Sequence, residues 1–388
     1  MNTRGIALYA ALIAGSAALV ANPLVVALVH PHPPALMLWY FAGIAAWLVA
    51  VTVAGAAYAR GSRRPWFAVA VLGLVLLPVA MAGTELGLTY ARLSGWIGGT
   101  APSPIHEPDP LNGWRPRASA TARDVSPGNF DVVYHTDASG RRMMPAVESG
   151  PTVHVFGDSF AFGQGVRDDE TALALLAARH SERIVNHGVM GYGIDQMMGR
   201  MLSADIKPGD TVVFAPVADD FRRNLVHRAH LCLFRVAPPR QVRVVPRLRD
   251  GRLEAVPVEE ACGVMEATLL NSNVLPLGIA FNRLRNRTVD PAAIGHAREV
   301  LAAAAAAARA RGATFRLVIL ASGSECGARR LQLDLGDLGM PYDTLLPACP
   351  DDPAAAAAMR FPSDYHWTPA GHRWAADALE RLLFRVGT

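Results

Sequence analysis

The sequence predicts an α/β domain built on a parallel sheet and preceded by three transmembrane helices. Residues 1–93 contain three long runs without a charged side chain. From residue 151 onward, short apolar runs typical of strands alternate with runs of helical composition, which favours a parallel sheet with helices on both faces. Polar residues gather after several of the predicted strands, where sites form in open parallel sheets.

The three uncharged runs span residues 5–29, 35–59 and 65–83. A helix needs about 20 predominantly apolar residues to cross a bilayer, so each run is long enough or nearly so. The alternative is a cleaved signal peptide followed by buried core helices. The first run is too long for the apolar part of a signal peptide and lacks a good cleavage site, which favours a membrane anchor over residues 1–93.

Arginines beside these runs predict the orientation of the anchor, because cytoplasmic loops are enriched in Lys and Arg. Arg4 precedes the first run, and the second connection, residues 60–64, reads RGSRR. The first connection, residues 30–34, contains neither Lys nor Arg. We therefore expect a cytoplasmic N-terminus in the inner or plasma membrane. The rest of the chain is then extracytoplasmic, in the periplasm or the extracellular space.

The exported part divides into two regions. Residues 94–150 are rich in Gly, Pro, Ser and Asp and include short β-like runs, so they are expected to form a linker and a β-rich extension. Residues 151–388 are expected to form the main α/β domain. Proline at position 291 and the pair Thr368-Pro369 are typical helix starts. The expected strands are residues 152–156, 183–186, 211–215 and 314–320, and the expected helices are residues 171–179, 194–204, 291–311 and 368–385.

Residues 221–288 interrupt the alternation of strands and helices. Their segment RVVPRLRDGRLEAVPV places Asp250-Gly251 between two β-like runs, which is a strong hairpin signal. The insertion is either a lid over the sheet or a hairpin on the surface, and the sequence leaves both interpretations open.

All four cysteines lie in the predicted exported part, and they are Cys232, Cys262, Cys326 and Cys349. Four cysteines allow three pairings, and neighbourhood in the sequence suggests Cys232–Cys262 and Cys326–Cys349. An oxidising compartment would permit both disulfides, and four free buried thiols are the alternative. The absence of a C-x-x-C motif makes a zinc knuckle unexpected.

The ingredients of a nucleophilic triad lie at predicted strand ends and before the last helix. Ser159 follows the first strand in VHVFGDSFAFGQGV, and Asp364 and His366 precede the last helix in SDYHWTPAGH. A serine becomes a good nucleophile when an imidazole takes its proton, and that imidazole needs a carboxylate to fix its tautomer. Asp364 and His366 are two residues apart, so a tight turn can bring them together.

Four short blocks resemble the SGNH (GDSL-type) hydrolase family over about residues 150–388. They are GDSF after the first strand, NHGVMGYG after the second, APVADDFRRN after the third, and SDYHWTPAGH. The resemblance implies a flavodoxin-like three-layer α/β/α domain and an esterase, lipase, acyltransferase or deacetylase. GVRDDET after the serine and HWTPAGH near the end resemble the membrane-anchored branch of the family. That branch is linked to acylation or deacylation of cell-envelope glycans.

The resemblance also implies a role for individual residues. Ser159 would be the nucleophile, His366 the general base and Asp364 the carboxylate that orients the base. The backbone N–H groups of Ser159 and Gly191 would bind the oxyanion, and Asp158 would support the loop through hydrogen bonds.

Two blocks depart from the usual family pattern. The last block has the spacing D-x-H instead of D-x-x-H, and in this respect it resembles alginate-acetylation-type SGNH domains. In the third block the family has Gly-x-Asn-Asp, whereas this chain reads Pro216-Val217-Ala218-Asp219. The side chain of Ala218 cannot donate to an oxyanion, and losing one such donor costs about 10² to 10³ in turnover. Asn224, six residues further on, is the substitute that the sequence offers.

These observations predict a membrane-anchored serine esterase or O-acyltransferase that acts on acyl esters of envelope glycans or lipids through an acyl-enzyme. If it is a transferase, a separate membrane acyltransferase is expected to supply the acyl donor.

No cofactor or metal is expected. Nucleic-acid binding is not expected either, because the net charge is only +4 and no basic stripe with interleaved aromatics is present. The alternative, motivated by Ala218, is a weakly active or inactive SGNH-shaped glycan-binding or scaffold module.

Overall fold

The computed structural model describes residues 105–126, 128–145, 150–223, 244–257, 291–322, 326, 337–362 and 364–384. All of them belong to one compact unit, formed by Thr100–Cys262 with Arg285–Thr388. The three predicted membrane helices lie outside the described residues, and so do Asn224, Cys232 and Cys262. Within the described ranges, no helix has both the length and the apolar composition that a membrane span requires.

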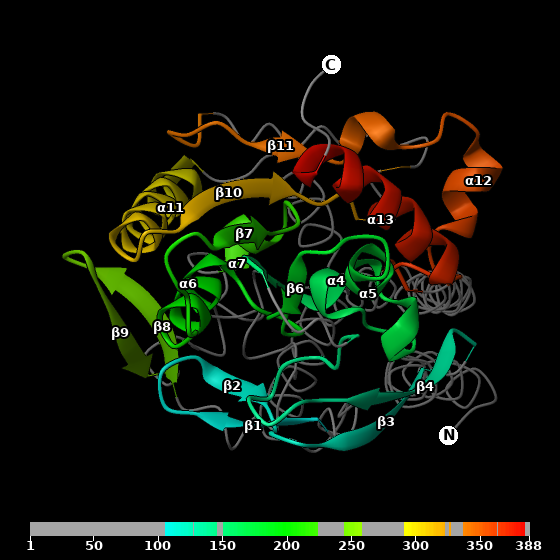
Figure 1. Ribbon diagram of the computed structural model, residues 1–388, viewed down its shortest axis with the longest axis horizontal. Coiled ribbons are helices and arrows are strands. Elements are labelled where there is room, and N and C mark those ends of the chain that lie inside the picture. Colours follow the sequence, from blue (N-terminus) through cyan, green and yellow to red (C-terminus); the bar gives the residue numbers. More distant parts are fainter. Residues whose placement is uncertain are drawn as a thin grey trace, which may run out of the picture. The chain divides into compact units, whose positions relative to one another are not determined.

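A five-stranded parallel sheet forms the centre of the unit (Figure 1). Its strands are β5 (Thr152–Gly157), β6 (Arg183–Asn186), β7 (Thr211–Ala215), β10 (Thr314–Ile319) and β11 (Asp343–Thr344). Their order in space is β6-β5-β7-β10-β11, which is the order 2-1-3-4-5 of flavodoxin-like doubly wound sheets. The predicted α/β class with a parallel sheet is therefore confirmed.

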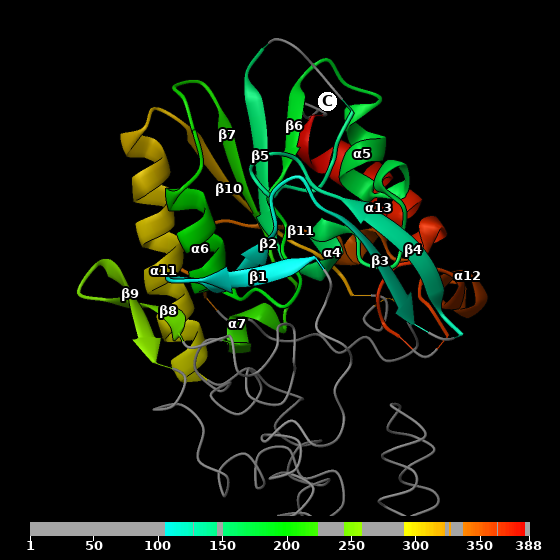
Figure 2. The same cartoon turned by 90° about the horizontal axis from the view of Figure 1, so that it is seen from below.

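Helices cover both faces of the sheet, as Figure 2 shows with α5 and α13 on one side and α6 and α11 on the other. The first layer contains α4 (Ser159–Phe162), α5 (Ala172–Ala177), α12 (Pro353–Ala358) and α13 (Pro369–Leu383). Val153 and Val155 of β5 pack in this layer with Leu173 and Leu176 of α5. The side chain of Thr171 caps α5 by accepting a hydrogen bond from the backbone N–H of Ala174, which satisfies one free donor at the helix start.

The second layer contains α6 (Ile194–Leu202), α7 (Asp220–Arg223) and the long α11 (Pro291–Ala310). Phe156 of β5 and Phe214 of β7 point into it, on the side opposite to their neighbours Val155 and Val213. Strand residues alternate between the two faces, so strands covered by helices on both sides must be apolar at almost every position. The continuous apolar runs in the sequence thus follow from the three-layer arrangement.

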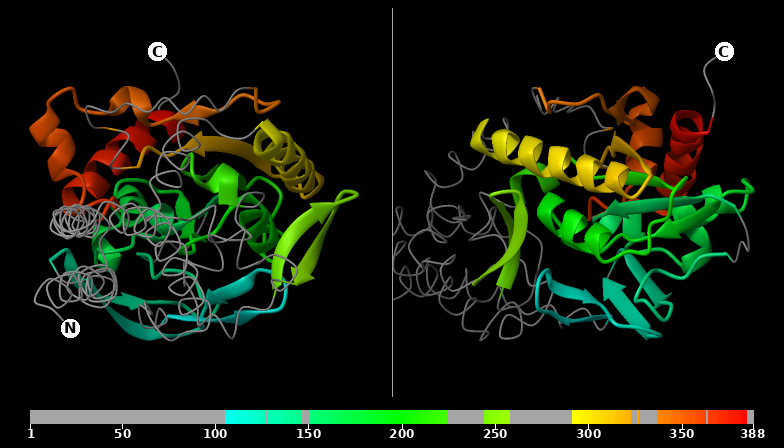
Figure 3. Two further views of the ribbon diagram at one scale, coloured as in Figure 1. Left: turned by 180° about the vertical axis from the view of Figure 1, so that it is seen from behind. Right: turned by 60° about the vertical axis from the view of Figure 1, so that its left-hand side comes forward.

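The region before the sheet forms two antiparallel hairpins (Figure 3). They pair β1 (His106–Asp109) with β2 (Gly113–Pro116), and β3 (Thr121–Ser126) with β4 (Phe130–His135). The described part of the predicted linker and extension between residues 105 and 145 therefore contains the short strands β1 to β4.

A buried arginine fastens this extension to the loop after α4. The guanidinium of Arg142 donates to Asp168 at 2.5 Å, to the carbonyl of Val166 at 2.8 Å and to the carbonyls of Phe162 and Gly163 at 3.2 Å. It also lies 4.5 Å from the centre of the Tyr134 ring. Because a buried charge is stable only when it is paired and hydrogen-bonded, these contacts account for Arg142 in the interior.

Beyond residues 221–223, which belong to α7, the described part of the insertion is a hairpin of β8 (Val244–Arg249) and β9 (Arg252–Pro257). Asp250 and Gly251 have φ values of 48° and 74°, which fits the two-residue turn that the dipeptide predicts. The hairpin packs on α6, where the N–H of Leu248 donates to Asp195 at 2.9 Å. Residues 244–257 therefore form the hairpin that Asp250-Gly251 predicts, and it contacts α6.

A disulfide joins Cys326 to Cys349, one of the two pairs that the sequence suggests. Both cysteines are buried in the layer that contains α5 and α13.

Candidate active site

Ser159 lies at the junction between β5 and α4. Asp158 is the N-cap of α4, and its Oδ1 accepts from the N–H of Phe160 at 2.9 Å. Gly157 makes the junction tight, since a Cβ atom there would lie 2.5 Å from Cβ of Ala161. As the first residue of the helix, Ser159 has a backbone N–H without an intrahelical acceptor, and this group is available to an anion.

The loop before α13 brings Asp364 and His366 to this junction. Its ends are tied together, since the N–H of Phe361 donates to the carbonyl of His366 at 3.1 Å and the N–H of Thr368 to that of Met359 at 2.9 Å. The indole of the buried Trp367 donates to the carbonyl of Ala321 at 3.1 Å. These contacts anchor the backbone on both sides of His366, from which the imidazole projects.

The three predicted side chains form a continuous hydrogen-bonded chain. Nε2 of His366 is 2.7 Å from Oγ of Ser159, and Nδ1 is 2.6 Å from Oδ1 of Asp364. The same carboxylate oxygen accepts from the backbone N–H of His366 at 2.9 Å. A proton on Nδ1 satisfies Asp364 and leaves Nε2 to accept the serine proton, which is the geometry that general-base activation of a hydroxyl requires.

The second glycine-rich loop packs directly on α4. Asn186 donates from Nδ2 to the carbonyl of Ala161 at 2.8 Å and accepts from the N–H of Gly188 at 2.9 Å. A Cβ atom on Gly188 would lie 2.4 Å from the backbone nitrogen of Phe162. Gly191 adopts a φ of 78° in the turn that follows, a conformation that favours glycine. The predicted oxyanion glycine thus belongs to a loop held against the helix that Ser159 opens.

The third block differs from the first two because Ala218 stands where the family pattern has an asparagine donor. Ala218 is buried in the apolar layer of α6 and α11, so its methyl group packs and offers no donor. Asn224, the predicted substitute, lies outside the described residues. The residue that the structure places beside Asp158 is Arg223, whose Nη1 lies 3.3 Å from Oδ2 of that aspartate.

Sequence reasoning missed Arg223. A usable signal was present, because Asp219 and Asp220 precede Arg223 by four and three residues, the spacing of side chains that meet on one helical face. In the structure both carboxylates pair with Arg223, at 3.4 and 2.6 Å.

The β3–β4 hairpin also reaches the site, a contact that no pattern in the sequence predicts. The Tyr134 hydroxyl donates to Asp124 at 2.9 Å and accepts from the N–H of Gly165 at 2.9 Å, on the loop after α4. The ring of Phe130 lies 5.3 Å from that of Phe361, in the loop that carries His366. Burial raises the pKa of Asp124 above its usual range, and the hydrogen bond from Tyr134, together with the charge that His366 carries when protonated, opposes that shift. The hairpin therefore forms a wall beside the candidate triad.

The second histidine of the last block, His372, is structural. It is buried, and its Nδ1 accepts from the backbone N–H of Ala172 at 3.1 Å. Burial, with the charges of Arg142 and His366 in support, lowers the pKa of His372 to about 3. Among the residues that the structure describes, no group of three or more His, Cys, Asp and Glu side chains is placed to hold a metal ion.

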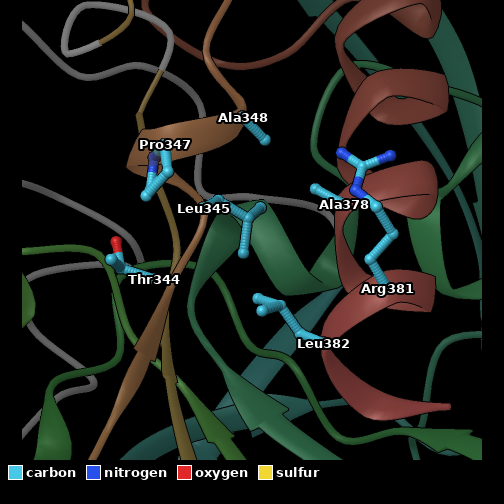
Figure 4. A pocket seen from close by; sticks show the side chains of 7 residues that line it. All are labelled: Thr344, Leu345, Pro347, Ala348, Ala378, Arg381 and Leu382. Atoms are coloured by element: carbon cyan, nitrogen blue, oxygen red, sulfur yellow. The ribbon is translucent and has the colours of Figure 1, made fainter. Parts of the chain in front are cut away.

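A pocket between η3 (Leu346–Ala348) and the C-terminal half of α13 lies away from the triad. Figure 4 shows Ala378 and Arg381 of α13 facing Leu345 and Pro347 across it. Because His366 precedes the other end of the same helix, this pocket does not belong to the candidate site.

Comparisons with known proteins add little to this geometry. No family model and no curated protein matches the chain. Among solved structures, TesA is 16% identical with a TM-score of 0.30, over 60% of this chain and 98% of that one. LAE5, an α/β hydrolase enzyme from the metagenome of Lake Arreo in Spain, is 16% identical with a TM-score of 0.32, over 60% of this chain and 94% of that one. At such TM-scores neither likeness supports an argument, and the functional case depends on the side chains described above.

Proposed function

We propose that the chain is a serine esterase or O-acyltransferase of the SGNH type that works through an acyl-enzyme on acyl esters of cell-envelope glycans or lipids. The observation that carries the proposal is the unbroken contact from Asp364 through His366 to Ser159, with donor–acceptor distances of 2.6 and 2.7 Å. The four sequence blocks that resemble the family support the same assignment.

The reaction follows from this geometry. Oγ of Ser159 attacks the ester carbonyl carbon while its proton passes to Nε2 of His366, and Asp364 stabilises the imidazolium. The backbone N–H groups of Ser159 and Gly191 bind the oxygen that becomes negative. The bond to the leaving alcohol then breaks, and His366 returns its proton to that alcohol. Water or a sugar hydroxyl, deprotonated by His366, attacks the acyl-enzyme and restores the serine.

We also propose that the enzyme acts outside the cytoplasm, anchored by the three apolar runs of residues 1–93. Their arginine distribution supports this location, and so does the Cys326–Cys349 disulfide, since such bonds persist in oxidising compartments. Alkaline phosphatase fused after Thr388 should be active in cells, and the same reporter fused at residue 62 should not. The reverse pattern would contradict the orientation.

Hydrolysis of p-nitrophenyl acetate by the full-length chain in detergent tests the activity. We expect turnover that disappears in Ser159→Ala and persists in Ser181→Ala, which alters an exposed serine between α5 and β6. Absence of turnover in the unmodified chain with short activated esters, or equal turnover in Ser159→Ala, would contradict the proposal.

A second candidate function is binding without catalysis, which the buried methyl group of Ala218 in the oxyanion block favours. In that case an envelope polysaccharide would bind the unmodified chain and Ser159→Ala equally well, and neither would release acyl groups. Calorimetry and acetate release measured on the same samples distinguish binding from catalysis.

A further inference from the structure

Arg223 connects the three loops that follow β5, β6 and β7. Its Nη1 lies 3.3 Å from Oδ2 of Asp158 and donates to the carbonyl oxygen of Tyr192 at 2.9 Å. Asp158 immediately precedes Ser159, and Tyr192 immediately follows Gly191. A single guanidinium nitrogen therefore contacts both residues that flank the proposed oxyanion donors.

The first of these contacts neutralises a carboxylate beside the nucleophile. Asp158 is fully buried, and its Oδ2 lies 3.4 Å from Oγ of Ser159. Without a cation, this oxygen would compete with Nε2 of His366 for the serine proton, and its charge would oppose the developing oxyanion in a medium of low dielectric constant. With Arg223 present, the shorter contact of Ser159 is the one to His366, at 2.7 Å.

The segment after β7 is arranged to hold this cation. Asp219 approaches Nε of Arg223 at 3.4 Å, and Asp220 approaches Nη1 at 2.6 Å. Asp220 is itself fixed, because its Oδ2 accepts from the N–H of Val217 at 2.9 Å. Burial lowers the pKa of Arg223, but the carboxylates of Asp220, Asp158 and Asp219 together outweigh it and raise the pKa of the guanidinium, so Arg223 stays charged. Burial raises the pKa of Asp220 well above its usual range, and the charge of Arg223 opposes that shift.

We propose that Arg223 is a positioning residue for the reaction of Ser159, an inference that rests on the proposed function. It compensates the charge of Asp158, which leaves the serine hydroxyl to His366, and it fixes the loop of Gly191 relative to α4. Ala218 occupies the position where the family pattern has the side-chain amide of an asparagine. In place of that third donor, Arg223 positions the two backbone donors, the N–H groups of Ser159 and Gly191.

The variant Arg223→Gln in the full-length chain tests this proposal. We expect kcat for p-nitrophenyl acetate to fall about 10²-fold with KM changed only a few-fold, because the nucleophile and the oxyanion donors are misplaced while the substrate surface remains. The matched control is Arg179→Gln, which removes an exposed arginine paired with Asp377 and Glu380 on α13. Its kcat should equal that of the unmodified chain.

A second substitution separates positioning from mere support of the fold. Asp158→Asn keeps an oxygen that can accept from the N–H of Phe160 but removes the charge that Arg223 compensates. In the Arg223→Gln background it should recover about tenfold or more of the lost kcat, as expected for two groups that act as a pair. A purely structural role for Arg223 predicts no recovery, and a further loss would also overturn the proposal.

Thermal unfolding of each variant shows whether a loss of activity reflects a loss of structure. If Arg223→Gln does not fold, Arg223→Lys replaces it in the test. It keeps the charge but not the planar guanidinium that reaches both Asp158 and Tyr192, and its kcat should fall about tenfold.

Folded arginine variants with unchanged kcat would overturn this inference alone. An unmodified chain that forms no acyl adduct on Ser159 would overturn the proposed function and this inference together.

Discussion

The two sides of Ser159 are built in different ways. On the base side, Asp364 and His366 come from one short loop, and their side chains meet Ser159 in series at 2.6 and 2.7 Å. On the side of the proposed oxyanion donors, the loop after β6 packs on α4, and the segment after β7 carries a largely buried ion cluster around Arg223. A base can be assembled from neighbouring residues, whereas an oxyanion site depends on how separate loops pack. The base side should therefore be intolerant of single side-chain changes, and the oxyanion side should be sensitive to backbone displacement.

The largest effect is expected from removing the nucleophile or its base. Ser159→Ala and His366→Ala should each lower kcat for p-nitrophenyl acetate about 10⁵-fold, and the double variant should be little worse, because the two groups act as a unit. Steady-state rates of the single and double variants check this. Losses that multiply in the double variant would mean that the two side chains act independently.

A smaller loss is expected from Asp364→Asn. The amide keeps the size of the carboxylate but cannot accept from Nδ1 in the same way, so His366 would present the wrong tautomer to Ser159. We expect kcat to fall about 10³- to 10⁴-fold with the fold intact. A loss below tenfold would show that the 2.6 Å contact between Asp364 and His366 has no catalytic role.

Gly188→Ala tests the oxyanion side through the backbone. The added Cβ would lie 2.4 Å from the backbone nitrogen of Phe162, so the loop carrying Gly191 must move away from α4. A displacement of about 1 Å can cost 10²-fold in rate, and we expect kcat to fall by about that factor. Gly295→Ala on α11, where a Cβ meets nothing within 4 Å, is the control and should leave kcat unchanged. Equal rates for both variants would contradict a role for the second loop.

The smallest effect on activity, with a clear effect on stability, is expected from His372→Asn. Well above pH 6.5, the usual pKa of histidine, neither the folded nor the unfolded state binds a proton at His372, so stability there is independent of this group. Below pH 6.5 the unfolded state binds a proton that the folded state, with a pKa of about 3, does not, and the free energy of unfolding falls.

At pH 5 this loss amounts to about 2 kcal/mol. Urea unfolding at pH 7.5 and pH 5 should therefore show a drop in the unmodified chain that is about 2 kcal/mol larger than the drop in His372→Asn, while kcat changes little. An equal drop in both proteins would contradict the buried neutral state of His372.

The parts of this molecule that the sequence could predict are those governed by local pattern. Strands such as β5 and β7 are covered on both faces and therefore stand out as apolar runs between glycine-rich turns. The Ser159 junction and the Asp364–His366 loop carry recognisable short blocks. The strand β11 has only two residues, too few to show any periodicity.

Contacts between distant segments could not be predicted in this way. The wall formed by Tyr134 and Phe130 depends on how the extension packs on the rest of the domain. Arg142 holds the extension in place, but no pattern in the sequence distinguishes it from a surface arginine. The contact between Arg223 and Asp158 could not be predicted for a similar reason, since the two residues are 65 positions apart in the sequence. The spacing of Asp219, Asp220 and Arg223 shows an ion cluster but not its position beside the nucleophile.

The proposed function depends above all on Ser159 as the nucleophile that carries the acyl group. Peptide mass spectrometry of the full-length chain, quenched in acid during turnover of p-nitrophenyl acetate, shows which residue is acylated. We expect one acetyl group on the peptide that contains Ser159, absent from Ser159→Ala and strongly reduced in His366→Ala. An unmodified Ser159 peptide during active turnover, or an acetyl group on a different residue, would contradict it.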